Sequence, residues 1–433
     1  MISMSSYLRG SLLFSVALSL IIVASTITFS TALAQTTHLD ELKQNISTRE
    51  DTIKQLEQEI ADFKQRLSNV DSQKKTLQGA LQTLDLSRAK LSKDIRLTQM
   101  KIERTNDLIS ELNGSISQKQ LKIEKNKTAI SDIIIKIDRI DANTLVEALL
   151  SNDTISSFLE DVDNMEKLQA SIRDNIKSLE RLKSELGGTK TSYQSERKKL
   201  TGLSAQLSDQ KEISDSERKQ QSALLLVTKN QESNYKKLLA DREARKKQFE
   251  QEINDFEAQL RAEIDPNSFP TPGTKVFAYP LDEHFITQKF GKTVDAQRLY
   301  VSGTHNGTDF RATPGTIIKS VANGTVTATG DTDKTCPNAS YGRWVLIKHR
   351  NGLSTLYGHL ELIKVRAGQE LEQGDTIGYS GNTGYSTGPH LHLTVYVSSA
   401  VQVTQLPSKS CRGAIFTIPV APQNAYLDPL AYL

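Results

Sequence analysis

The absence of proline from the first 265 residues constrains this chain more than any other feature of its sequence. All 11 prolines lie at or after Pro266, and only six of the 23 glycines come before it. Because proline breaks helices and glycine weakens them, the amino-terminal part is predicted to be mostly helical. Six of the seven histidines lie at or after His284, so we expect any histidine-based chemistry in the carboxy-terminal part.

Apolar residues in the amino-terminal part recur at alternating steps of three and four. The seam begins with Leu42, Ile46, Ile53, Leu56, Ile60, Phe63, Leu67 and Val70 and continues to Ile137. Such spacing over many heptads predicts a coiled coil, and a run of ~100 helical residues would span about 150 Å. A second, looser helical stretch is expected from Ile155 to about Leu260, with breaks or frayed turns at Gly187-Gly188 and Gly202.

An apolar cluster, residues 145–159, interrupts the heptads between the two helical stretches. Two long helices joined by a short patch predict an antiparallel hairpin within one chain, although a parallel dimer fits the heptads too. This region is either a spacer or a regulatory or partner-docking arm. In the second case, the apolar cluster is the expected docking surface.

Residues 1–34 have the composition of an export signal. Arg9 is the only charge, an uncharged run extends from Ser11 to Ser30, and Ala32-Leu33-Ala34 fits a signal-peptidase site. The run of about 20 residues is also long enough to be an uncleaved membrane anchor. Both interpretations place the rest of the chain outside the cytoplasm, in the periplasm or at the cell surface, with membrane attachment only through this segment.

Charge and cysteine content exclude several classes of protein. Fifty-four basic and 51 acidic residues give a net charge of +3, unlike a polycationic nucleic-acid binder, so no nucleic-acid partner is expected. Two cysteines exclude a disulfide scaffold and a multi-cysteine zinc module. The expected organisation is a signal peptide (1–34), a coiled-coil region (35–265), a proline-rich linker (266–278) and a carboxy-terminal domain (279–433).

The carboxy-terminal domain is predicted to be all or nearly all β. Runs rich in β-branched residues at 316–321 and 325–329 flank Asn323-Gly324, which is typical of a hairpin. A second hairpin is predicted around Asn351-Gly352, and residues 390–397 form a further strand.

The histidines of this domain have the spacing of a metal site. His390 and His392 are two apart on the predicted strand, so both side chains leave the same face. His305 and Asp309 are four apart among glycines, which favours a turn that enters a strand. Two histidines, one carboxylate and an open position for water form a catalytic zinc set. Further histidines beside such a set can take the proton of the water or bind the oxyanion.

Together these motifs resemble the M23 family of zinc metallopeptidases, the lysostaphin-like or LytM-like peptidoglycan endopeptidases. The resemblance covers about Tyr279 to Val397 and rests on ITQKFG at 286–291, His305 with Asp309, YGHL at 357–360 and GNTGYSTGPHLH at 381–392. It implies a long α-helical coiled coil followed by an all-β, antiparallel LytM-like peptidase domain.

The same resemblance implies a role for five residues. One zinc ion per peptidase domain would be held by His305, Asp309 and His392. His359 and His390 would be the catalytic histidines around the water and the oxyanion. All five positions match the family pattern, so the leading hypothesis is an exported zinc endopeptidase that hydrolyses peptide bonds in peptidoglycan, for wall remodelling or division.

The order of signal, coiled coil, apolar cluster and peptidase domain also resembles the murein hydrolase activator group, the EnvC-like and PcsB-like division proteins. This resemblance implies a division ABC transporter as a partner of the coiled coil. The alternative function is a non-catalytic activator or scaffold of another murein hydrolase, but EnvC-like members lack parts of the zinc site. A restraining coiled coil would make the isolated peptidase domain cleave faster than the mature chain.

Cys336 and Cys411 are the only cysteines, and both lie in segments that depart from the family pattern: 331–341 and the tail after Val397. Export would place them where disulfides persist. We predict a disulfide between them, closing a loop of about 75 residues that contributes roughly 4 kcal/mol. Two unpaired thiols are the alternative.

Overall fold

The structure is a computed structural model that describes residues 41–65, 76–141, 155–260, 264–386, 388–408, 411 and 413–433. The predicted export signal and most of the apolar cluster at 145–159 lie outside the described residues. The chain divides into two compact units: the chain up to Gln55 with Leu97–Gln206, and Leu56–Arg96 with Leu207–Leu433. No described helix has an apolar stretch long enough to cross a bilayer.

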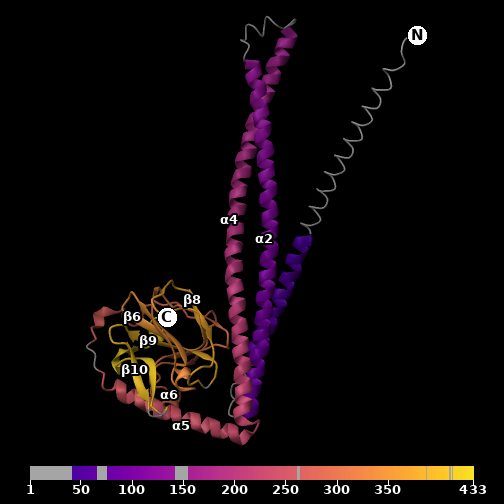
Figure 1. Ribbon diagram of the computed structural model, residues 1–433. Coiled ribbons are helices and arrows are strands. Elements are labelled where there is room, and N and C mark those ends of the chain that lie inside the picture. The colour runs from indigo at the N-terminus through magenta and orange to yellow at the C-terminus, as the bar shows by residue number, and fades with distance from the viewer. Residues whose placement is uncertain are drawn as a thin grey trace. The chain divides into compact units, whose positions relative to one another are not determined.

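The described helical part consists of residues 41–65, α2 (Leu77–Asp141), α4 (Ile155–Thr228) and α5 (Glu232–Glu257) (Figure 1). In the first unit, Lys119 donates to Thr189 at 2.9 Å, and Asn126 donates to Ser178 at 3.3 Å. Residue numbers therefore increase along α2 in the direction in which they decrease along α4. The predicted antiparallel hairpin within one chain is confirmed.

The heptad seam of residues 42–137 does not form one helix. Arg49 pairs with Glu103 in the first unit and Glu59 pairs with Lys93 in the second, so helix 41–65 runs antiparallel to α2. The predicted single run is wrong: α2 has 65 residues, a length of about 98 Å. Heptad spacing defines the apolar face of a helix but not the direction of its partner, and a chain that folds back buries the same seam.

The predicted breaks at Gly187-Gly188 and Gly202 are also wrong, because α4 continues through them for 74 residues. A glycine costs about 1 kcal/mol in a helix interior, which a long packed helix tolerates. The chain leaves the helix instead at Lys229 and Asn230, whose φ angles of 50° and 55° lie in the left-handed region. α5 begins two residues later.

The described strands of the second unit form a ten-stranded sheet and a separate two-stranded sheet of β10 and β11, and the pairings between them are antiparallel. The main order is β1-β2-β9-β6-β5-β4-β7, with β12 paired to β9 and β8 paired to β3 and β6. The strands are β1 Ile286–Gln288, β2 Thr308–Arg311, β3 Ile317–Lys319, β4 Gly324–Asp331, β5 Arg343–His349, β6 Leu353–Ile363, β7 Glu370–Leu371, β8 Thr376–Ser380, β9 His390–Val397, β10 Gln402–Ser408, β11 Ala414–Val420 and β12 Tyr426–Leu427. One six-residue helix, α6 (Val294–Leu299), and short 3-10 turns complete this nearly all-β domain, as predicted.

One of the two predicted hairpins is confirmed. β5 and β6 pair across Asn351-Gly352, and the strand predicted at 390–397 is β9. The hairpin predicted around Asn323-Gly324 is wrong, because β3 pairs with β8 while β4 pairs with β5 and β7. Gly324 is already the first residue of β4, and a Cβ there would lie 2.6 Å from the Lys348 carbonyl oxygen. The glycine is therefore required by the close approach of β5 and not by a turn.

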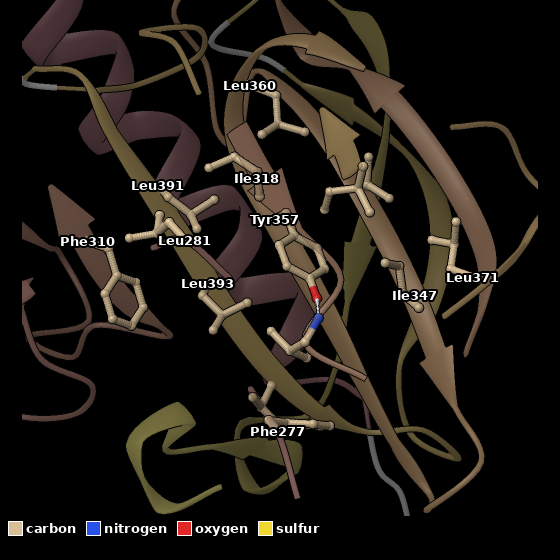
Figure 2. Packing of buried hydrophobic residues seen from close by; sticks show 14 of the residues in the cluster. Phe277, Leu281, Phe310, Ile318, Ile347, Tyr357, Leu360, Leu371, Leu391 and Leu393 are labelled. Carbon is tan, nitrogen blue, oxygen red and sulfur yellow. Dashed lines mark hydrogen bonds between the residues drawn. The ribbon is translucent and has the colours of Figure 1, made fainter. Parts of the chain in front are cut away.

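The larger apolar cluster of the domain lies on one face of the central strands (Figure 2), and a second cluster with Trp344, Leu346 and Leu356 lies on the other face. Phe310 of β2, Leu391 and Leu393 of β9, and Tyr357 of β6 are fully buried. The Tyr357 hydroxyl accepts a hydrogen bond from the Val321 backbone N–H at 3.1 Å, which satisfies this buried group (Figure 2). Because side chains alternate along a strand, the residues between these core positions face the other side of the sheet, where the predicted site residues lie.

The predicted linker, residues 266–278, lies against the domain. The Gly273 N–H donates to the Ala431 carbonyl at 2.8 Å, and the Phe277 N–H donates to the Tyr432 carbonyl at 2.9 Å. The Phe277 side chain is buried in the core. This segment therefore contributes to the packing of the domain and is not a free tether.

Candidate active site

Three neighbouring strands position the predicted metal ligands. Asp309 on β2 lies opposite His392 on β9, and Gly358 on β6 lies on the other side of His392. His305 comes just before β2 and forms an isolated bridge with Gly291, so the predicted turn into a strand is confirmed. The side chains of all three candidate ligands are buried.

The three candidate ligand atoms converge. His305 Nε2 lies 3.2 Å from His392 Nδ1 and 3.4 Å from Asp309 Oδ1, and His392 Nδ1 lies 2.8 Å from Asp309 Oδ1. The other ring nitrogens are hydrogen-bonded: His305 Nδ1 to the Lys289 carbonyl at 3.1 Å, and His392 Nε2 to Thr394 Oγ1 at 2.9 Å. If these nitrogens carry the ring protons, the remaining lone pair of each histidine faces the carboxylate of Asp309.

This donor set fits a zinc ion. Ligand atoms at about 2.0–2.1 Å from a tetrahedral zinc are separated by roughly 3.4 Å, close to the distances found here. Burial would raise the pKa of Asp309, but three neighbouring histidines, above all His390, lower it well below its usual range and keep the carboxylate ionised. Among the described residues, His305, Asp309 and His392 are the only group of histidine, cysteine and acidic side chains close enough to share a metal.

His359 faces this centre because of an irregularity in β6. Arg343 of β5 pairs with Leu360 while Val345 pairs with Tyr357, so β6 has one extra residue, a bulge, at this point. His359 has a φ of 60°, a strained value for a non-glycine residue that is typical of functional sites. Its Nδ1 is hydrogen-bonded to the Thr383 carbonyl at 2.8 Å. Its ring centroid lies 4.6 Å from that of His390.

His390 is the first residue of β9 and lies beside the ligands. Its Nδ1 is hydrogen-bonded to the Gly388 carbonyl at 2.7 Å, and its Nε2 lies 3.6 Å from Asp309 Oδ1. The structure thus brings together all five residues that the sequence selected. His349, which has no motif around it, is buried in the sheet, with hydrogen bonds to the Asn323 carbonyl and to Thr355 Oγ1.

Several residues of the site were not selected from the sequence. A Cβ on Gly307 would lie 2.5 Å from the Leu393 carbonyl oxygen and 2.7 Å from the His392 ring, so only glycine fits there. Tyr300 stacks on His305, with ring centroids 5.2 Å apart and planes 8° apart. Tyr341 lies 5.6 Å from the His392 ring. Gly307 lies inside the segment that carries His305, which was a usable signal, but no motif pointed to either tyrosine.

A groove of about 430 Å³ opens onto His359, His390 and His392, and helix α5 forms one of its walls. Lys246 Nζ donates to the Leu299 carbonyl at 2.6 Å. Glu250 accepts a hydrogen bond from the Val301 N–H at 3.1 Å. The last helix of the predicted coiled-coil region therefore lies along the candidate active site.

The β10–β11 hairpin also packs against α5, through Phe249, which lines the groove as well. Phe249 of α5 and Phe416 of β11 are buried against each other, with ring centroids 4.6 Å apart. Ile418 and Val420 of the same strand complete the apolar cluster. The predicted disulfide is present in this cluster: Cys336 is bonded to Cys411, with Cα atoms 5.8 Å apart. The bond joins the 331–341 loop to the hairpin on the side that faces α5.

An antiparallel β domain with a buried His-Asp-His centre and two further histidines beside it defines a metallopeptidase-like site. Residues 303–404 match peptidase family M23. The carboxy-terminal part of this chain is an M23 peptidase domain, as the sequence motifs predicted.

Related proteins match part of the chain. The chain is 38% identical over 123 residues to the peptidoglycan DD-endopeptidase ShyA of Vibrio cholerae, a match that covers 28% of this chain and 26% of that protein. It is 41% identical over 100 residues to the DD-carboxypeptidase/endopeptidase Mpg of Neisseria meningitidis, covering 23% and 22%. The chain thus spans about a quarter of the length of these curated relatives.

Two solved structures are also similar to part of the chain. A zinc-containing peptidase from Vibrio cholerae is 32% identical, with a TM-score of 0.25, over 30% of this chain and 37% of that chain. The catalytic domain of lysostaphin from Staphylococcus simulans is 24% identical, with a TM-score of 0.26, over 34% and 90%.

Proposed function

We propose that this chain is an exported zinc-dependent endopeptidase that hydrolyses peptide bonds in peptidoglycan, for cell-wall remodelling or division. The convergence of His305 Nε2, His392 Nδ1 and Asp309 Oδ1 carries this proposal. The names of the relatives, which include a peptidoglycan DD-endopeptidase, support the choice of substrate.

The neighbouring histidines have the geometry for proton transfer. A bound zinc ion would polarise the scissile carbonyl and lower the pKa of its water to about 7. Burial, together with His390 and His392, lowers the pKa of His359 well below its usual value, so His359 is neutral at pH 7, as a general base must be. Its Nδ1 is held by the Thr383 carbonyl, which leaves Nε2 to accept the proton.

His390 is placed to act as a hydrogen-bond or proton donor in the reaction. The Gly388 carbonyl holds its Nδ1 and fixes the ring orientation. Its Nε2, 3.6 Å from Asp309, faces the same space as the candidate ligands. In its protonated form this nitrogen would donate to the oxyanion of the tetrahedral intermediate or to the leaving amine.

We also propose that the coiled-coil region is a regulatory arm. The docked helix α5 forms a wall of the groove, so a bulky peptidoglycan strand requires α5 to move. The contacts of Lys246 and Glu250 with the segment at 299–301 and the apolar contact of Phe249 with Phe416 hold α5 in this position. Binding of a partner to the arm, such as a division ABC transporter, would then control access.

The test uses the exported form of the chain, residues 35–433, with zinc measured by elemental analysis. Incubation with purified peptidoglycan, with and without a chelator, should release peptide fragments that mass spectrometry identifies. His359→Ala is the matched inactive control, because it keeps the ligand set. Fragments that are equally abundant with chelator or with His359→Ala would contradict the proposal. A zinc-loaded chain that cuts nothing, even with α5 released, but activates a separate amidase would establish the activator alternative.

A further inference from the structure

Lys246 of α5 is an unusual residue for the wall of a groove. It is only 5% exposed, although lysine is rarely buried without partners. Its ammonium group lies 4.0 Å from the ring centroid of Tyr385 and 4.7 Å from that of Tyr300. It donates to the Leu299 carbonyl at 2.6 Å and lies 3.3 Å from Glu250 Oε1. Two aromatic faces and a carbonyl thus surround one positive charge.

The partners of this ammonium group come from two sources. Glu250 is on α5 itself, four residues further along the helix. The Tyr300 and Tyr385 rings and the Leu299 carbonyl belong to the peptidase domain. Leu299 is the last residue of α6, where backbone carbonyls have no partner within the helix. When α5 leaves, Glu250 leaves with it, and the domain keeps a cation site without its cation.

Two of these groups also have contacts within the domain. The Tyr300 hydroxyl donates to Gln288 Oε1 at 3.3 Å, and its ring stacks on His305. The Tyr385 backbone N–H donates to the Ser340 carbonyl at 2.8 Å. These contacts do not involve α5, so they can persist when α5 leaves.

The cation site borders the candidate catalytic centre. The Tyr300 ring contacts both Lys246 and His305, which is a candidate zinc ligand. Tyr385 lies five positions before His390 in the loop that leads into β9. Both tyrosines line the same groove as the catalytic histidines. The Tyr300 ring would separate a ligand at this site from the candidate metal centre. The substrate residues next to the scissile bond must bind at such a position.

We propose that Tyr300, Tyr385 and the Leu299 carbonyl form a substrate subsite for a primary ammonium group, which Lys246 fills while α5 is docked. This inference rests on the proposed function, because the ligand is the peptide that the enzyme cuts. The substrate would carry a free amine near the scissile bond, either on a diamino-acid side chain or at a peptide amino terminus. Acylation of that amine removes the charge and abolishes the interaction with the aromatic faces.

The experiment measures binding by calorimetry to the zinc-free full chain carrying Lys246→Ala and Phe249→Ala, which removes the resident ammonium group and releases α5. Three synthetic peptides of one composition (alanine, glutamate, lysine and two alanines) are compared. The first has a free lysine amine and a blocked amino terminus, the second has an acetylated lysine and a free amino terminus, and the third has both amines acetylated. One of the two peptides with a free amine should bind about tenfold more tightly than the doubly acetylated peptide. The peptide with the higher affinity identifies which amine supplies the ammonium group.

Two second-site variants separate recognition from folding. Tyr385→Leu added to these substitutions should reduce the tenfold preference to about threefold, because it removes one of the two aromatic faces. Tyr385→Phe should preserve the preference, because it keeps that face. Equal binding of the three peptides, or a preference that stays tenfold with Tyr385→Leu, would overturn the inference. Because no hydrolysis is measured, an amine preference in a chain that cuts nothing would disprove only the proposed function.

Discussion

The apolar contact between α5 and the β10–β11 hairpin offers a direct way to release the arm. Phe249→Ala removes an aromatic side chain that is 4% exposed and lies 4.6 Å from the fully buried ring of Phe416. Phe249 contacts the domain through the apolar cluster that also contains the disulfide. The candidate catalytic histidines are not part of this cluster, so the substitution leaves them in place, although Phe249 also lines the groove and its truncation widens it.

Truncation of a buried phenylalanine to alanine costs about 3–5 kcal/mol. Here the loss falls mainly on the docked state, because the ring is solvated once α5 leaves. Since about 1.4 kcal/mol corresponds to a factor of ten in an equilibrium constant, the ratio of undocked to docked chains should rise about 100-fold or more. As long as the docked state remains dominant, the rate of peptidoglycan cleavage should rise by the same factor.

The assay compares initial rates of cleavage by the zinc-loaded wild-type chain and the Phe249→Ala chain. Hydrogen exchange of α5 serves as an independent measure of docking. Gln248→Ala, at the exposed neighbouring position on α5, is the matched control and should leave both quantities unchanged. Faster exchange of α5 without a change in cleavage rate would refute the idea that docking restrains the enzyme.

Three further predictions concern pH and the candidate centre. Burial raises the pKa of Glu257 to about 7 in the docked helix, against an ordinary value of 4.5, so docking is strongest below about pH 4.5 and weakens as the pH rises towards 7. Glu257→Gln should therefore lower the cleavage rate relative to wild type much more at pH 8 than at pH 5, and a ratio that is the same at both pH values would contradict this linkage. His392→Ala should leave two ligands and lose the metal, so near-stoichiometric zinc by elemental analysis would disprove its role. His359→Ala and His390→Ala should each keep zinc but lose turnover by roughly 10²–10⁴-fold, and wild-type-like rates would exclude them as acid–base groups.

Local sequence patterns determined the fold class, and motifs that resemble the M23 family selected the residues of the candidate site. Strand periodicity placed His390 and His392 on one face of β9, because alternation along a strand depends only on the local backbone. Helical content followed in the same way from the absence of proline. The disulfide between Cys336 and Cys411 was also predicted from sequence, because two cysteines can form only one disulfide within a chain.

Tertiary structure decided which segments meet. Heptad spacing could not reveal that helix 41–65 returns along α2, because an apolar seam has no direction. The pairing of β3 with β8 was equally hidden, since it joins segments about 60 positions apart and no local turn records it. The placement of α5 along the groove depends on a buried contact between Phe249 and Phe416. The sequence around each phenylalanine does not indicate that the two side chains meet, because burial depends on the surfaces that surround a residue and not on the residue itself.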